Sequence, residues 1–128
     1  MTFRAPRSAL LAAVPFDIEG PKKRLEANVG GYEIVHASPG LELGVYVLRA
    51  PEPDHQQPHD DDEIYIVLDG WGVLDVEGTP MPLEPGSAVF VPAGAHHQFT
   101  GYEQLSVLVI FARRWRIGGD AGRQHLPV

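Results

Sequence analysis

The stretch 55-HQQPHDDDEIYIVLDG-70 joins a polar loop to an apolar run near the middle of the chain. Side chains alternate between two faces along an extended strand, so Gln57, His59 and Glu63 project to the same side, together with Tyr65 and Val67. A carboxylate that faces a protein core costs free energy unless it is paired or binds a cation. Because His59 lies on the same side as Glu63, the stretch predicts a cation site inside the protein.

A second stretch, 86-GSAVFVPAGAHHQF-99, supplies another inward histidine. His96 and His97 are adjacent, so they face opposite sides of a strand and only one of them can join an internal site. His97 shares its side with Phe99, which we expect in the core. The pattern therefore predicts that His97 points inward and that His96 lies at the surface or at a pocket rim.

The chain as a whole shows the spacing of an all-β protein. Its 128 residues include 14 Gly and 12 Pro, and the turn signals that these residues make separate short runs rich in β-branched and aromatic residues. This pattern favours a barrel or sandwich over alternating strands and helices. The predicted strands are 32–36, 41–49, 64–68, 71–77, 87–91, 96–100 and 104–112.

The dipeptide Asp69-Gly70 is a favoured hairpin turn because the turn requires positive φ angles. We therefore expect the strands 63–68 and 71–77 to be antiparallel neighbours. The aromatic residues Trp71 and Phe90 are expected to serve in packing rather than to line a pocket.

Length and composition predict one domain. We expect an N-terminal arm at 1–28, a barrel at 29–112 and a C-terminal tail at 113–128. The arm is expected to pack on the barrel or on a partner subunit through its apolar residues, which are Leu10, Leu11, Val14 and Phe16.

Charge and cysteine content exclude several classes of partner and site. The net charge of −7 disfavours nucleic acid, which requires a basic surface. With no Cys, the chain has neither a disulfide framework nor a thiolate metal site, which fits a cytoplasmic protein. No apolar run approaches the roughly 20 residues needed to cross a bilayer, so we expect no membrane partner.

Over residues 32–112 the chain resembles a small single-domain bacterial cupin. The first cupin motif corresponds to 57-QPHDDDEIYIVLDG-70 and the second to 86-GSAVFVPAGAHHQF-99, with fifteen residues between Gly70 and Gly86. The resemblance implies a conical, jelly-roll-like barrel of two antiparallel sheets (a double-stranded β-helix). It also implies one divalent transition metal ion (Fe, Mn, Zn or Ni) near the wider mouth of the barrel.

By the same resemblance, His59, Glu63 and His97 are metal ligands. Most cupins carry a further histidine where this chain has Gln57, whose amide oxygen is a weaker donor than an imidazole nitrogen. Three candidates for that coordination position stay open, namely Gln57, His55 and a water molecule. His55 requires a bend in the loop, because four extended residues place it about 13 Å from His59.

The remaining polar residues of this loop, Gln56 and the acidic run 60–62, are expected to be solvated. Tyr65 faces the site and is either a substrate contact or part of the barrel filling.

The function implied by the resemblance is that of a metal-binding cupin acting on a small organic molecule. Oxygenase-like chemistry is the leading hypothesis, with isomerase or lyase chemistry as less common fates of such sites. The alternative is a non-catalytic module that binds a metal or a small ligand. We also expect a homodimer, because exposed sheet edges invite pairing.

Overall fold

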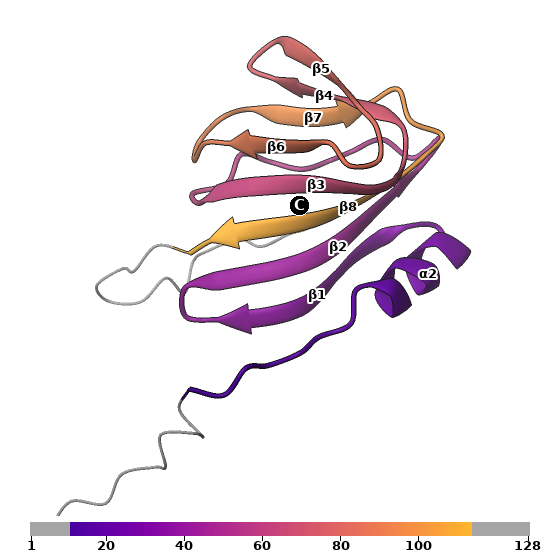
Figure 1. Ribbon diagram of the computed structural model, residues 1–128. Helices are drawn as coiled ribbons and strands as arrows, with labels where there is room; N and C mark the ends of the chain where they lie inside the picture. Colours follow the sequence, from indigo (N-terminus) through magenta and orange to yellow (C-terminus); the bar gives the residue numbers. More distant parts are fainter. Residues whose placement is uncertain (1–10, 114–128) are drawn as a thin grey trace, which may run out of the picture.

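A computed structural model describes residues 11–113 of the chain, and it has two antiparallel β-sheets that face each other (Figure 1). The larger sheet has the strand order β1-β2-β8-β3-β6 and the smaller one the order β5-β4-β7. The predicted all-β architecture is therefore confirmed. The strands are β1 (Gly31–Ser38), β2 (Leu41–Arg49), β3 (Asp62–Gly70), β4 (Gly72–Val76), β5 (Thr79–Leu83), β6 (Ala88–Val91), β7 (His97–Thr100) and β8 (Gln104–Ala112).

Seven of these strands overlap the predicted ones, and β5 is the strand that the sequence pattern missed. Its residues 79-TPMPL-83 contain two prolines, which cannot donate backbone hydrogen bonds and so argue against a strand. β5 is tolerated because it lies at the edge of the three-stranded sheet and pairs only with β4.

The expected pairing of the strands on either side of Asp69-Gly70 is wrong. β3 pairs with β6 and β8 in the larger sheet, whereas β4 pairs with β5 and β7 in the smaller one. The positive φ of 86° at Gly70 therefore serves a corner between two sheets. The tight hairpin turn lies instead at Glu77-Gly78, between β4 and β5, where both residues have positive φ angles.

The hydrophobic core lies between the two sheets. Its largest fully buried apolar and aromatic side chains come from β3, β4, β7 and β8, so both sheets contribute to one cluster. Alternation along the strands accounts for this, since every second residue of each strand faces the opposite sheet. The residues are Tyr65, Leu74, Phe99, Leu105 and Phe111.

The helix α2 (Glu19–Ala27) covers part of the outer face of the larger sheet (Figure 1). Ser106 on β8 donates a hydrogen bond of 2.6 Å from its Oγ to Glu26 Oε2, and Arg49 on β2 donates to the Glu26 carbonyl. This helix lies within the stretch predicted as an arm, whose domain boundaries remain predictions. Within residues 11–113 no helix is long and apolar enough to cross a membrane.

Before the helix, the chain runs along the edge strand β1 and then away from the sheet (Figure 1). Phe16 stacks on His36 of β1 with ring centroids 5.3 Å apart, whereas Leu11 and Val14 are exposed. Of the predicted arm contacts, only Phe16 therefore packs on the barrel. Leu10 and the tail beyond residue 113 lie outside the described residues.

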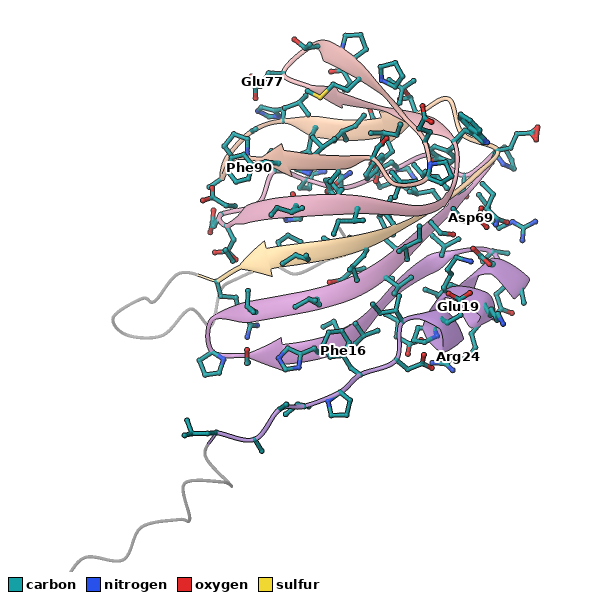
Figure 2. All side chains as sticks on the ribbon, viewed as in Figure 1. Phe16, Glu19, Arg24, Asp69, Glu77 and Phe90 are labelled. Carbon is teal, nitrogen blue, oxygen red and sulfur yellow. The ribbon has the colours of Figure 1, made fainter. Side chains whose placement is uncertain are left out.

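The expectation that Trp71 and Phe90 serve in packing is wrong for the described chain, because they are 65% and 58% exposed. Trp71 lies at the corner between the two sheets. Phe90 lies on the outward side of β6, since it pairs with the outward Ile64 (Figure 2).

Candidate metal centre

Three ligand-type side chains meet inside the barrel from three separate segments. Glu63 lies on β3 of the larger sheet, His97 on β7 of the smaller sheet, and His59 in the loop before β3. Their ligand atoms all lie within 4.8 Å of one another, and the three residues are 1%, 7% and 8% exposed respectively. The predicted inward direction of these three side chains is confirmed.

Backbone hydrogen bonds hold the two loops of the site together. The Gly94 amide donates to the His59 carbonyl over 2.7 Å, and the Ala93 amide donates to Asp62 Oδ1 over 2.9 Å. Gly94 has a φ of 83°, which a glycine adopts without strain. The turn before β7 thereby fixes the loop that carries His59 against the strand that carries His97.

The ring of His97 is held in one orientation. Its Nδ1 donates to the Ala95 carbonyl over 2.8 Å, because a carbonyl can only accept. The other nitrogen, Nε2, lies 2.9 Å from Glu63 Oε1 and 3.0 Å from the Tyr65 hydroxyl. A carbonyl that accepts from the far nitrogen in this way fixes the tautomer of a metal-binding histidine.

Without a cation, His97 and Glu63 form a buried ion pair. Burial lowers the pKa of His97, but the short contact with Glu63 and the charge of its carboxylate outweigh burial and raise the pKa above its ordinary value. The site therefore places a negative charge where it attracts a proton, and a metal ion competes with that proton for the same atoms.

The carboxylate of Glu63 meets the requirements of a metal ligand. Both oxygens are buried; His97 Nε2 lies 2.9 Å from Oε1, and the Tyr65 hydroxyl is also a neighbour of the carboxylate. A buried carboxylate in this state is costly unless a cation is present. Two imidazole nitrogens and one carboxylate form a donor set that suits Fe, Mn, Ni and Zn, so the residues fit the implied ion.

Aromatic rings form the walls around these donors. The edge of the Phe111 ring faces His59 with centroids 5.2 Å apart, and the His59 and His97 rings lie 5.6 Å apart. Tyr65 is fully buried on the same side. Burial, followed by the charge of Glu63, raises the pKa of Tyr65 well above its ordinary value. The phenol therefore stays protonated at neutral pH.

Gln57, proposed from the sequence as the next donor, is exposed. It lines a hollow of about 290 Å³ together with His96 and His97, and His96 is exposed as expected. His55 is also exposed, and its Nε2 lies 3.6 Å from Glu52. Coordination by Gln57 remains a prediction.

The sequence pattern missed two residues beside the site, Asp54 and Gln56. Asp54 is 2% exposed and accepts hydrogen bonds of 2.8 Å from the Tyr46 hydroxyl and from the Phe99 amide. Burial, followed by the charge of Asp54, raises the pKa of Tyr46. Gln56, expected to be solvated, accepts a hydrogen bond of 2.9 Å from Tyr65.

The expectation for the acidic run 60–62 is also partly wrong, because Asp61 is buried and Asp62 is half-buried. Asp61 shares its parity with His59 and Glu63, so the alternation that placed those two residues inward applied to Asp61 as well.

Comparison with known proteins identifies the family of this fold and site. The family model described as "Cupin domain" matches residues 47–111. The chain is a cupin. The predicted barrel and its two motifs are thereby confirmed, and the matched range includes every residue of the candidate metal centre.

Two relatives illustrate how far the similarity extends. An uncharacterised protein of Streptomyces coelicolor is 38% identical over 87 residues, covering 67% of this cupin and 83% of the relative. An acireductone dioxygenase of Leishmania infantum is 33% identical over 112 residues, covering 77% of this cupin. The alignment covers 32% of that enzyme, so this cupin corresponds to about a third of its length.

Among solved structures, an RmlC-like cupin with a double-stranded β-helix fold from Methanocaldococcus jannaschii superposes with a TM-score of 0.65. It covers 80% of this cupin and 92% of the other chain at 16% identity, which supports the fold alone.

Proposed function

We propose that this cupin binds one divalent transition metal ion through His59, Glu63 and His97 and catalyses dioxygenase-type chemistry on a small organic molecule. The convergence of these three buried donors within 4.8 Å carries the proposal. Two histidines and one carboxylate are also the ligand types of non-haem iron oxygenases.

The relatives point the same way. The alignment with the acireductone dioxygenase of Leishmania infantum covers most of this cupin, although it covers only about a third of that enzyme. A molecule with neighbouring oxygen atoms, such as an acireductone, a keto acid or a catechol-type phenol, is therefore the substrate class to test first.

The residues of this chain would hold and shield the ion. Glu63 supplies the negative charge, His59 and His97 supply neutral nitrogens, and the Ala95 carbonyl keeps Nε2 of His97 directed at the ion. The ring of Phe111 restricts water on the side of His59. The bound metal would supply Lewis-acid and redox chemistry.

Gln57 is our proposed fourth protein donor. Its side chain shares a hollow with His97, and a rotation of the side chain from its exposed position is required for it to reach the ion. Water and His55 are the competing donors. His55 is disfavoured because it is exposed and faces Glu52.

Elemental analysis of untagged protein tests the metal proposal. We expect close to one transition metal ion per chain in the wild type and almost none in His59→Ala. His55→Ala is the matched control, since this histidine lies in the same loop but is exposed, and it should retain the metal. Equal and negligible metal in all three proteins contradicts the proposal.

Oxygen consumption then tests the chemistry. Protein reconstituted anaerobically with Fe(II) should consume oxygen when it is given a substrate from the classes above, and His59→Ala should not. Stoichiometric metal without turnover across these classes and with Mn, Ni and Zn would favour the non-catalytic binding module.

We also propose that two copies pair through the outer face of the larger sheet. A cross-strand row on this face, which we call the outer row, is apolar across four strands: Leu43, Ile110, Ile64 and Phe90. Phe90 and Ile64 are exposed, and an exposed contiguous apolar surface is typical of an interaction site.

The N-terminal segment supports a second copy as the occupant. His36 pairs with Leu43, so the Phe16 ring that stacks on His36 extends the outer row at the β1 edge (Figure 2). Leu11 and Val14, which follow the same segment away from the sheet, are exposed. One copy thus carries both an apolar sheet face and an apolar arm, which a two-fold pair would cover together.

A further inference from the structure

A chain of hydrogen bonds runs from a buried loop carboxylate to the candidate metal centre. Asp54 accepts from the Gln56 side-chain amide, Gln56 Oε1 accepts from the Tyr65 hydroxyl over 2.9 Å, and the Tyr65 oxygen lies 3.0 Å from His97 Nε2. Asp54 and Tyr65 are 2% and 0% exposed, whereas Gln56 between them is half-buried.

Asp54 decides which group donates and which accepts in the next hydrogen bonds of this chain. Asp54 receives hydrogens from the Tyr46 hydroxyl and from the backbone amides of Phe99 and Gln56. A carboxylate in such surroundings acts only as an acceptor, so the NH₂ group of Gln56 must face Asp54. The carbonyl oxygen of the Gln56 side chain therefore must face Tyr65.

The orientation of Gln56 in turn decides that of the Tyr65 hydroxyl. A phenol has one hydrogen, and the Gln56 oxygen can only accept it. The lone pairs of the Tyr65 oxygen are then directed at His97 and the interior of the site. Glu63 is the competing acceptor for this hydrogen, but its oxygens are those assigned to the metal, which leaves Gln56 as the acceptor.

We propose that Asp54 and Gln56 are positioning residues that hold Tyr65 as a hydrogen-bond acceptor toward the metal centre. The site would then favour a ligand with a hydroxyl group beside its metal-binding oxygen over the same ligand with an ether at that position. This inference rests on the proposed metal site and narrows its substrate class to hydroxylated molecules.

A matched pair of small ligands tests this preference without any turnover. Glycolate and methoxyacetate each offer a carboxylate and a second oxygen to a metal, but only glycolate carries a hydroxyl hydrogen. Their affinities for the Co(II)-loaded protein are measured by titration of its visible absorption spectrum. We define the ratio as the affinity for glycolate divided by the affinity for methoxyacetate. We expect this ratio to fall roughly three- to tenfold from wild type to Tyr65→Phe, the scale of one hydrogen bond.

The two positioning residues are tested in the same way. In Gln56→Met the acceptor is lost, so the Tyr65 hydroxyl is free to donate into the site, and the ratio should fall at least as far as in Tyr65→Phe. Asp54→Asn releases the orientation of Gln56 and should also lower the ratio. Glu52→Gln, an exposed change in the same loop, should leave the ratio at its wild-type value.

An unchanged ratio in Tyr65→Phe and Gln56→Met, with cobalt bound, overturns the inference while the metal proposal stands. A wild-type protein that binds no cobalt overturns the metal proposal and the ligand preference with it. Where cobalt binds, NMR of the Zn(II)-loaded protein tests the hydrogen-bond chain by itself, because the metal then occupies the competing acceptor Glu63. The side-chain carbonyl ¹³C resonance of Gln56 should shift in Tyr65→Phe, and an unshifted resonance in a folded variant contradicts the chain.

Discussion

The two faces of the larger sheet have opposite chemistry in neighbouring rows. The inner row crosses β2, β8 and β3 through Glu42, Phe111 and Glu63, so two carboxylates are buried inside the barrel. One residue further along the strands, the outer row exposes Ile64 and Phe90. Buried charge and exposed hydrocarbon each cost free energy in an isolated chain, so Glu63 and the outer row are where our proposed metal ion and second copy would act.

The two buried carboxylates also differ from each other. Glu42 accepts a hydrogen bond of 3.0 Å from the Tyr32 hydroxyl and contacts Arg113 Nη2 at 3.3 Å. Glu63 is close to His97, to the Tyr65 hydroxyl and to the candidate metal position. The protein satisfies the charge of Glu42 with its own side chains, whereas the surroundings of Glu63 favour an external cation.

The largest effect is expected from a substitution of Glu63 in the inner row. Glu63→Gln keeps the shape of the side chain but removes its charge, so metal affinity should fall by more than about 100-fold, beyond the usual cost of losing a second-shell group. Competition with a chelator measures the affinity, and circular dichroism checks the fold. Glu84→Gln, an exposed loop carboxylate, is the control, and an equal loss in both variants contradicts the assignment.

Metal binding should stabilise the folded cupin. At free metal of 100 times the dissociation constant, the free energy of unfolding rises by about 2.7 kcal/mol, which corresponds to roughly 10 °C in Tm for a domain of this size. Differential scanning calorimetry with and without metal measures this shift. The shift should vanish in His59→Ala, and an equal shift in that variant would point to binding elsewhere.

The outer row predicts a smaller effect, on self-association. Phe90→Asp places a charge in the apolar face and should weaken pairing about 30-fold, which is the effect of losing one interface hot spot. Light scattering across a dilution series measures the association. Trp71→Asp is the matched control, because Trp71 is exposed to a similar degree but lies off the row. A wild type that is monomeric at high concentration refutes the pairing.

The smallest expected effect concerns Gln57. If its amide oxygen coordinates the ion, Gln57→Ala should lower metal affinity about tenfold, because a neutral amide contributes less than an imidazole or a carboxylate. The same chelator competition measures it. An affinity equal to that of the wild type would assign this coordination position to water.

Much of the metal centre could be predicted from local order. The period of two along residues 63–67 placed Glu63 and Tyr65 on one side, and the same rule separated His96 from His97. The structure confirms these directions because both segments are regular strands. The rule failed in the earlier part of the loop before β3, where Asp54 and Gln56 are placed by contacts with Tyr46, Tyr65 and Phe99 from other strands.

What the sequence by itself determined is the inward set His59, Glu63 and His97, the all-β class and the two cupin motifs, since alternation and turn residues act over a few neighbours. Only the tertiary structure decided that the Asp69-Gly70 turn joins two sheets and that Phe90 is exposed. It also decided that Gln56, rather than Gln57, contacts Tyr65. These features depend on which strands pair across the barrel, and that choice is made by packing between residues far apart in the chain.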